Sequence, residues 1–296
     1  MSKRIDLHIH TTCSDGTLSP LEIIDEAKKN RLDTISITDH DTVNAYTEEL
    51  LKYAKENNIN IISGVEVSTK IEKCGIHVLG YNIDINNKEL HNQLKKLRNA
   101  RHDYLLKVSK KIKELGYIIN TEKLNQIDAV TKAHIALDIV NNEQNKELLM
   151  KEFNKIPSKG EFIETIMNEN CPAYVKKETI TPKEAVNLIR NAGGKAVLAH
   201  PVAYTYEDDL TTDDIQKILT DMNADGIEAY YMYIDQTHKK HNEIEKWKAF
   251  AKYNNKFVTI GSDFHIKDGH HPLMGLLNDI DITEKEINEI LVNIKK

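Results

Sequence analysis

The stretch Asp6–Gly16 reads DLHIHTTCSDG, and its first residues complete a short β-rich run that begins at Arg4. His8 and His10 lie two residues apart, so on a β-strand both imidazoles point to the same face. The pair alone is weak evidence of a site, because a chain with 13 histidines contains roughly half such a match by chance. Whether the pair belongs to a site depends on whether similar residues lie near the other predicted strands.

Short β-rich runs alternate with longer helical patterns along most of the chain. The runs cover residues 4–8, 34–38, 59–62 and 76–80, and after a gap 195–199, 226–229 and 257–260. One helix between them has a predicted start at Thr181-Pro182, an N-cap followed by a first-turn proline, and a stop at Gly193-Gly194. This βα alternation predicts an α/β fold, and a single β/α barrel can accommodate 296 residues.

The segment 86–176, between the two strand-containing blocks, lacks a strand pattern. Its apolar residues recur at intervals of three and four up to Gly116, which is typical of a helix with one buried face. These residues are Leu90, Leu94, Leu97, Tyr104, Leu105, Val108, Ile112 and Leu115. We therefore expect a barrel built from residues 1–85 and 177–296, and a helical insertion over 86–176 that covers the active site.

Histidines and carboxylates occur at or near the ends of almost all the predicted strands. Besides His8 and His10 they are His40, Glu66, His77, His200, Asp263 and His265, with Asp39 and Asp41 flanking His40. In a β/α barrel the C-terminal strand ends converge on one functional face. Imidazoles and carboxylates without thiolates suit zinc, iron or manganese, and the group is too large for one ion. The pattern predicts a cluster of divalent transition metals.

Composition and charge argue against several other classes of protein. Hydrophobic residues make up 40% of the chain, and no apolar run approaches the roughly 20 residues that span a bilayer. The N-terminus has no export signal, and Cys13, Cys74 and Cys171 lack CxxC spacing, so we expect a cytoplasmic protein with reduced thiols. A net charge of −6 argues against extended binding of duplex nucleic acid, but bound cations can attract a small phosphorylated substrate.

The motifs DLHIHTTCSDG, TDHDT, GVEVS, LAHP and GSDFH occur in this order from Asp6 to His265 and resemble those of the polymerase and histidinol phosphatase (PHP) superfamily. The resemblance implies a distorted seven-stranded β/α barrel with three divalent metal ions, either manganese, iron or zinc. The implied ligand sets are His8, His10, Glu66 and Asp263 for the first ion, Glu66, His77 and His200 for the second, and Asp15, His40 and His265 for the third. Glu66 would bridge the first two ions.

Within this superfamily the chain is most similar to stand-alone enzymes with a helical insertion, which include nucleotide 5′-phosphatases and 3′,5′-nucleotide bisphosphate phosphatases. Their insertion commonly carries an Arg-Pro-His element that resembles Lys132-Ala133-His134. Lys132 and His134 are therefore the expected substrate-binding residues. The lysine departs from the pattern, because it binds phosphate as a point charge and not as a planar fork.

The resemblance implies hydrolysis of a phosphate monoester by a metal-activated hydroxide, with a nucleotide 5′-monophosphate or 3′,5′-bisphosphate as substrate. Asp263, His265 and His200 are the candidates for protonating the leaving group. The alternatives within phosphoesterases are a 5′-3′ exonuclease on short oligonucleotides and a histidinol-phosphate phosphatase. A metal-dependent amidohydrolase also begins with an HxH strand, and a non-catalytic metal-binding module is the alternative from a different class.

Overall fold

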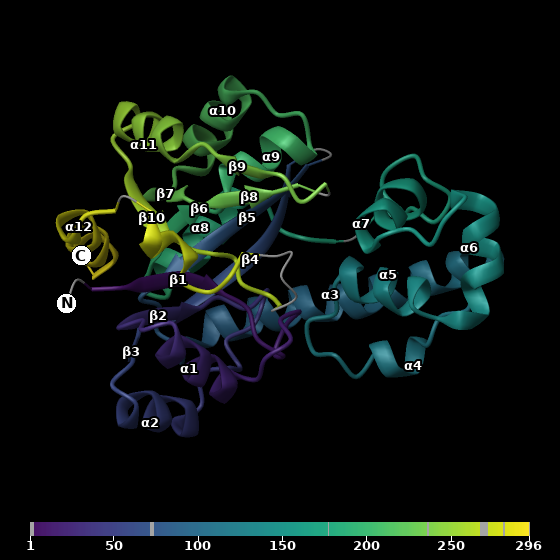
Figure 1. The fold of residues 1–296 in the computed structure, drawn as a ribbon, viewed down its shortest axis with the longest axis horizontal. Helices are drawn as coiled ribbons and strands as arrows, with labels where there is room; N and C mark the ends of the chain where they lie inside the picture. Colours follow the sequence, from purple (N-terminus) through teal and green to yellow (C-terminus); the bar gives the residue numbers. More distant parts are fainter. Residues whose placement is uncertain are drawn as a thin grey trace. The chain divides into compact units, whose positions relative to one another are not determined.

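The computed structural model describes residues 3–71, 74–176, 178–235, 237–266, 272–280 and 282–295, and Figure 1 draws its ribbon. The chain divides into two compact units. Unit 1 comprises Met1–Leu94 and Ile180–Lys296, and unit 2 comprises Lys95–Thr179. All the described strands belong to unit 1, whereas the regular structure described in unit 2 is helical.

Unit 1 is built around two hydrogen-bonded sheets. Three parallel strands form the first sheet, in the order β1 (Ile5–Ile9), β2 (Thr34–Ile37) and β3 (Asn60–Ile61). Five strands form the second, in the order β10 (Phe257–Ile260), β7 (Gly226–Tyr230), β6 (Lys195–Leu198), β5 (Cys74–Tyr81) and β4 (Gly64–Ile71). A hairpin of β8 (Met232–Ile234) and β9 (Lys240–Asn242) is separate from both. Each predicted β-rich run contains a strand, and the α/β fold is confirmed.

Strand β4 differs from the sequence-based expectation. The third predicted run ends at Ile62, but a further strand begins at Gly64 and includes Glu66. β4 pairs antiparallel with β5, with Ser68 opposite His77, and β5 pairs antiparallel with β6. Glu66 was expected to follow a strand, but it lies inside the antiparallel strand β4. His77 lies on a strand, β5, as expected.

Single bridges connect the two sheets at both sides. Ile9 of β1 pairs with Phe264 beyond β10, and His40 beyond β2 pairs with Glu66 of β4. The backbone N–H of His10 donates to the Phe264 carbonyl at 2.9 Å. These bridges bring the motif-bearing ends of β1, β2 and β10 to the start of β4. Continuous hydrogen bonding around a closed ring is not formed between the described strands, so the seven-stranded barrel stays an expectation.

The helices of unit 1 follow the strands and pack on the sheets. They are α1 (Pro20–Lys29), α2 (Glu48–Glu56), α8 (Pro182–Asn191), α9 (Pro201–Glu207), α10 (Thr212–Met222), α11 (Ile244–Tyr253), α12 (Glu284–Lys295) and the 3-10 turn η3 (Leu276–Asp279). Helix α8 begins as predicted, because Thr181 and Glu184 cap each other's backbone N–H and Pro182 occupies the first turn. Gly193 adopts a φ of +79° beyond its end, which confirms the predicted stop.

Unit 2 has a hydrophobic core of its own. Its elements are the long helix α3 (Lys88–Glu114), which begins in unit 1, then α4 (Thr121–Leu124), α5 (Lys132–Val140), η1 (Glu143–Asn145), α6 (Lys146–Phe153), α7 (Lys159–Phe162) and the π-turn η2 (Ile163–Met167). The second half of the apolar stripe of α3, from Tyr104 to Ile112, is buried in this core against α5 and η2. The prediction that this stripe is core is confirmed. Gly116 adopts a φ of +91° after the helix.

No helix in the described ranges is both long and apolar enough to cross a membrane. The expected cytoplasmic location stays a prediction. Coverage of the active site by the helical insertion also stays a prediction, as does the boundary at residues 85 and 86.

Candidate metal centre

His8 in strand β1 and His10 directly after it lie in the interior of unit 1. His8 and His10 are fully buried, and their Nε2 atoms lie 3.1 Å apart. Two imidazole nitrogens at this distance either share a proton or share a cation, because two lone pairs repel each other when nothing lies between them. The predicted common orientation of the two rings is confirmed.

The loop after β1 folds back so that Asp15 returns to His10. Asp39 holds the start of the loop, because its carboxylate accepts from the backbone N–H and the hydroxyl of Thr11, both at 2.7 Å. Gly16 closes the turn against the backbone of His10, where an added Cβ would lie 2.3 Å from the carbonyl oxygen. No other residue fits at this close approach without moving the backbone. The sequence TTCSDG therefore acts as a shaped turn that positions Asp15.

Four side chains meet at the first group, as the resemblance implies. Asp263 Oδ1 lies 3.2 Å from the Nε2 atoms of both His8 and His10. Glu66 Oε2 lies 3.4 Å from His8 Nε2 and 3.2 Å from His10 Nε2. Ligands of a tetrahedral ion with bonds of 2.0–2.1 Å are about 3.4 Å apart. The four donor atoms therefore have the mutual spacing of a coordination shell.

Glu66 joins the first group to a second one. Its Oε1 atom lies 2.9 Å from His77 Nδ1 and 3.2 Å from His200 Nε2. Its Oε2 atom, which faces the first group, also lies 3.0 Å from His40 Nδ1. One carboxylate therefore faces five imidazoles in total with its two oxygens, which is the geometry of a bridging ligand.

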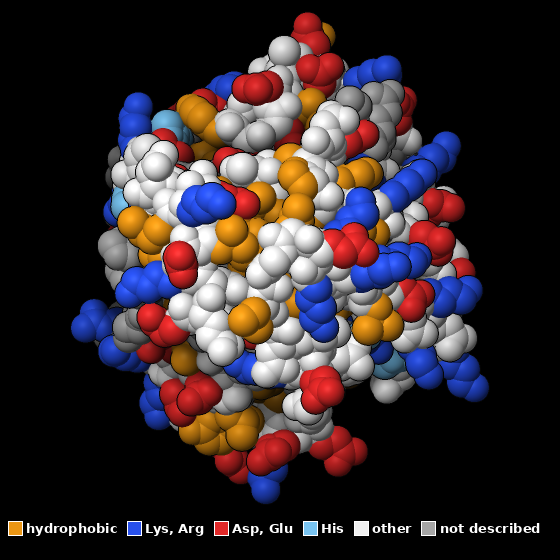
Figure 2. All heavy atoms as spheres, turned by 90° about the vertical axis from the view of Figure 1, so that its right-hand side faces the viewer, with side chains coloured by type: hydrophobic (Ala, Val, Ile, Leu, Met, Phe, Trp, Pro, Cys, Tyr) orange, Lys and Arg blue, Asp and Glu red, His pale blue; other side chains and the backbone are white. Residues whose placement is uncertain are grey.

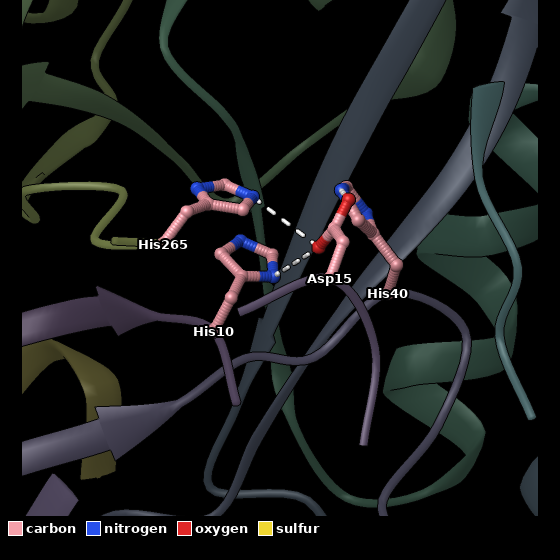
Figure 3. Close-up of side chains that lie close together, drawn as sticks. All are labelled: His10, Asp15, His40 and His265. Atoms are coloured by element: carbon pink, nitrogen blue, oxygen red, sulfur yellow. Dashed lines mark ion pairs between the residues drawn. The ribbon is translucent and has the colours of Figure 1, made fainter. Parts of the chain in front are cut away.

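The third group surrounds Asp15 (Figure 3). Asp15 Oδ1 lies 3.3 Å from His265 Nε2 and 3.6 Å from His10 Nδ1, and Asp15 Oδ2 lies 3.7 Å from His40 Nε2. His40 thus presents one ring nitrogen to this group and the other to Glu66. The structure brings eight of the nine predicted ligands into three groups, with His10 added to the third group and His40 in place of His200 beside Glu66 and His77. His200 lies next to this set, 3.2 Å from Glu66 Oε1.

Burial and the close pairing of imidazoles with carboxylates shift the pKa values of this cluster. Burial lowers the pKa of His10, but the carboxylates of Asp263 and Glu66 outweigh burial and raise it to about 10. Burial, aided by the neighbouring imidazoles, lowers the pKa of His40 to about 3. Burial raises the pKa of Glu66, yet the imidazoles around it hold that pKa well below its ordinary value. The carboxylates are therefore ionised, as metal ligands must be.

Several donor atoms of the cluster have no hydrogen-bond partner among the described residues. They are Asp15 Oδ1, His40 Nδ1, Glu66 Oε2, His77 Nδ1 and His200 Nδ1, and all are buried. Burying a polar atom without a hydrogen-bond partner costs about 1–3 kcal/mol. Five such atoms at one place therefore need a common partner. Divalent cations fit these donors, because each of the three groups offers imidazoles together with at least one carboxylate.

Two residues of the site adopt a left-handed backbone after their strands. His200, after β6, has a φ of +25°, and Asp263, after β10, has a φ of +54°. Such conformations cost of order 1–3 kcal/mol in residues other than glycine and concentrate at functional sites. Gly261 precedes this turn, and an added Cβ there would lie 2.2 Å from His8 Cβ. The motifs LAHP and GSDFH therefore describe sharp turns as well as ligands.

Glu228 is a site residue that the sequence analysis missed. It is fully buried in β7, and both its oxygens lie 3.1 Å from His8 Nδ1. It also accepts from the backbone N–H of His200 at 2.9 Å. A proton on His8 Nδ1 that faces Glu228 leaves the Nε2 lone pair for the cluster. The sequence signal that could have identified Glu228 is that it is the single charged residue in the predicted run 226–229.

Replacing Glu228 should weaken metal binding through His8. We expect Glu228→Gln to lower metal affinity by about 10- to 100-fold, because carboxylates that orient a ligating histidine typically contribute that much. Competition with a chelator measures the affinity. Glu245→Gln is the matched control, because Glu245 is exposed and contacts only Lys248 among the ion pairs of the described chain. Equal affinities of Glu228→Gln and the parent protein would contradict this role.

The residues expected to bind substrate lie at the start of α5 in unit 2. Lys132 Nζ donates to Asn168 Oδ1 at 2.9 Å. His134 Nδ1 accepts from the backbone N–H of Thr131 at 3.1 Å, and the two residues form a capping box. Both side chains therefore have local structural contacts. Their role toward a substrate stays a prediction.

Comparison with known proteins identifies relatives over almost the whole chain. A 5′-3′ exoribonuclease of Haemophilus influenzae is 30% identical, over 91% of this chain and 92% of the relative. A 5′-3′ exoribonuclease of Escherichia coli is 31% identical, over 88% and 84%. A 3′,5′-nucleoside bisphosphate phosphatase of Chromobacterium violaceum is 27% identical, over 88% and 87%.

Two solved structures share the fold. One is described as a metal-dependent phosphoesterase from Bifidobacterium adolescentis, with a TM-score of 0.75, 20% identity and coverage of 99% of this chain and 97% of that chain. The other is described as an amidohydrolase from Chromobacterium violaceum with bound sulfate and no metal, with a TM-score of 0.75, 24% identity and coverage of 91% and 90%. At these identities the likeness concerns the fold.

The buried donor groups and these relatives define the class of protein as a hydrolase acting on phosphoester bonds, with a site suited to divalent metal ions. The PHP domain model matches residues 6–296. The chain belongs to the PHP domain family. The resemblance seen in the five motifs is confirmed.

Proposed function

We propose that this protein hydrolyses phosphate esters of nucleotides at a cluster of three divalent metal ions, manganese, iron or zinc, at one end of a distorted seven-stranded barrel. The observation that carries the proposal is the convergence of eight buried or partly buried imidazoles and carboxylates in three overlapping groups, with His200 beside them at 3.2 Å from Glu66. Each group has the donors of a transition-metal site, and Glu66 contacts two of the groups.

The substrate class follows from what the relatives have in common. Their names specify 5′-3′ exoribonucleases and a 3′,5′-nucleoside bisphosphate phosphatase. A nucleoside 3′,5′-bisphosphate and the first residue of a 5′-phosphorylated RNA share one chemical unit, a nucleoside with phosphate esters on both its 5′ and 3′ oxygens. We propose that this unit is what the protein binds. The proposed substrate is a small nucleotide with a phosphate monoester, and a short oligonucleotide is the alternative substrate.

The charge distribution of unit 2 is compatible with such a ligand. In α3, Lys and Arg outnumber Asp and Glu, although the whole chain has a net charge of −6. Figure 2 shows Lys and Arg side chains at both margins and near the middle of the molecular face drawn, interspersed with Asp and Glu. Mixed charge of this kind supports contact with a few phosphates and not a continuous track for a duplex.

Bound divalent cations lower the pKa of water and neutralise charge on the phosphoryl oxygens. The protein's own groups orient the site around them. His265 Nδ1 lies 2.8 Å from the Asp263 carbonyl, so it carries the ring proton and leaves the Nε2 lone pair toward Asp15. The Tyr231 hydroxyl donates to Asp263 Oδ2 at 3.2 Å and holds that carboxylate with Oδ1 toward His8 and His10. Of the three proton-donor candidates, His200, Asp263 and His265, each directs an atom into the cluster.

Lys132 provides a test of the substrate-binding element. We expect Lys132→Ala to lower kcat/KM on a nucleotide roughly ten- to a hundredfold, because a charge-assisted phosphate contact contributes about 1.5–3 kcal/mol. Metal content should stay unchanged. Lys132→Arg should keep most of the activity, since it retains the positive charge. If Lys132→Ala hydrolyses every substrate as well as the parent protein does, the lysine serves only its hydrogen bond to Asn168.

A substrate panel tests the function itself. Metal-replete protein is assayed on a nucleoside 3′,5′-bisphosphate, a nucleoside 5′-monophosphate, a short 5′-phosphorylated RNA and histidinol phosphate. We expect the bisphosphate or the RNA to give the highest kcat/KM. A preference for histidinol phosphate would transfer the assignment to that alternative. Absence of hydrolysis on all four would support a non-catalytic metal-binding role.

A further inference from the structure

Tyr206 on α9 is exposed and yet held in a fixed orientation. Its side chain is 43% exposed, and Tyr253 is the only other tyrosine in the described ranges with a largely exposed side chain. The Tyr206 ring stacks on Tyr233 of β8, with centroids 5.3 Å apart and planes at 16°. His241 of β9 lies 4.2 Å from the same ring, and the Tyr206 hydroxyl donates to Glu243 at 3.0 Å. Three contacts thus fix one aromatic ring at the surface.

The supports of this ring are themselves fixed. His241 Nε2 lies 2.7 Å from the Asp235 carboxylate, which also accepts from two backbone N–H groups of the hairpin turn, those of Thr237 and Lys239. Tyr233 is only 7% exposed. Stacking on a ring whose orientation is already set loses little conformational entropy, which favours binding of a flat ligand.

The aromatic supports of Tyr206 leave one face of its ring without an aromatic neighbour among the described residues. The centroids of Tyr233 and His241 lie 5.8 Å apart, and each lies near Tyr206, so the two supports occupy the same side of that ring. Among the described residues no aromatic side chain packs on the opposite side. Tyr206 keeps 43% of its surface exposed beside these supports.

The ring is close to the metal centre along two routes of the chain. Helix α9 begins directly after His200, and Tyr206 lies six residues further on, about 9 Å along a helix that rises 1.5 Å per residue. Tyr231, whose hydroxyl contacts Asp263, is two residues before Tyr233. Figure 1 shows α9, β8 and β9 grouped on the side of unit 1 toward which β1 runs. This separation between backbone positions is compatible with the distance from the phosphate to the base of one nucleotide.

We propose that the face of Tyr206 opposite Tyr233 is open to solvent and binds the nucleobase of a nucleotide whose phosphate lies at the metal centre. The inference rests on the proposed function and adds a base-binding subsite to it. Every nucleobase has a π face, so a stacking platform accepts all four bases without reading their edges. The protein should therefore show weak base preference and a strong requirement for a base.

The test compares substrates with and without a base. Parent protein, Tyr206→Ala and Tyr206→Phe are assayed on a nucleoside 3′,5′-bisphosphate and on base-free ribose 3,5-bisphosphate. We expect Tyr206→Ala to raise KM for the nucleotide roughly 5- to 150-fold, the usual effect of removing one base-stacking ring, with little change in kcat. KM for the base-free compound should not change, because it has nothing to stack. Tyr206→Phe should behave as the parent, since it keeps the ring.

Tyr253→Ala is the matched control, because Tyr253 is 83% exposed at the end of α11. Thermal melting of each variant checks that it is folded. An unchanged KM of folded Tyr206→Ala on the nucleotide overturns the platform, and so does an equal rise in KM for the base-free compound.

Binding without turnover separates this proposal from the proposed function. Calorimetry measures the affinity of parent protein and Tyr206→Ala for a nucleoside 5′-monophosphate and for ribose 5-phosphate. The parent should prefer the nucleotide, and the variant should lose that preference. If hydrolysis fails but this preference and its loss are observed, the proposed function is wrong and the platform stands. If the parent hydrolyses nucleotides but has no such preference, the platform is wrong and the function stands.

Discussion

Glu66→Gln should reduce phosphoester hydrolysis by more than about 100-fold, which is the upper range for residues that only support a metal ligand. Glu66 is fully buried, and its two oxygens face imidazoles in two different groups. An amide has the same shape but only one oxygen, and its NH₂ group would face a ring nitrogen or a cation. It can complete at most one of the two groups. The measurement is kcat/KM on a nucleotide together with metal content by elemental analysis.

Glu161→Gln is the control for this substitution. Glu161 lies in the first turn of α7 in unit 2, where it caps the backbone N–H of Ser158 and pairs with Lys155. A glutamine at this position can still cap the helix. We expect normal activity and normal metal content in this variant. If Glu66→Gln retains the activity and metal of the parent protein, Glu66 is not part of the site.

The sequence predicted most of the site because motif residues lie next to strands. His8 and His10 share a face as a direct result of strand geometry, and His200 and Asp263 follow the ends of β6 and β10. Their convergence could be predicted because parallel strands of one barrel end on the same side. The assignment of nine residues to three groups needed the family resemblance, since spacing alone does not say which ligands are neighbours.

The features that could not be predicted depend on pairing between distant segments. The predicted run 59–62 ends before Gly64, and only pairing with β5 reveals that Gly64 begins β4. Glu66 and His77 were both named from the sequence, but antiparallel pairing places Glu66 within a strand, and that position was not predicted. Glu228 was overlooked for a related reason. A glutamate in a short strand reads as a solvent-facing residue until the structure shows that His8 is its neighbour.

The relation of His40 to its neighbours illustrates a further limit. Its two ring nitrogens face different groups, Nδ1 toward Glu66 and Nε2 toward Asp15. The neighbours of each ring nitrogen are known only from the three-dimensional structure. Which nitrogen binds a cation is set by the contacts of the other nitrogen. The structure therefore places His40 next to two groups of ligands, whereas the resemblance assigned it to one.

Prolonged chelation should abolish hydrolysis, and protein purified without chelator should contain more than one equivalent of transition metal per chain. The eight residues of the three groups cannot be served by a single ion, because Asp15 and His77 contact separate sets of partners. Manganese, iron or zinc should restore activity better than magnesium, since imidazole nitrogens are favoured by softer ions and magnesium prefers oxygen ligands.

Elemental analysis and reconstitution decide this prediction together. Metal is removed and each ion is added back stepwise, with activity and bound metal followed at every step. Three overlapping groups predict that activity rises only after more than one equivalent has bound, because the shared carboxylate of Glu66 needs partners on both oxygens to be fixed. Thermal melting of the metal-free protein distinguishes an empty site from an unfolded chain. Full activity at one equivalent or less would contradict the multinuclear centre, and the additional donors around Asp15 would then serve as an ion-pair network that holds the loop after β1.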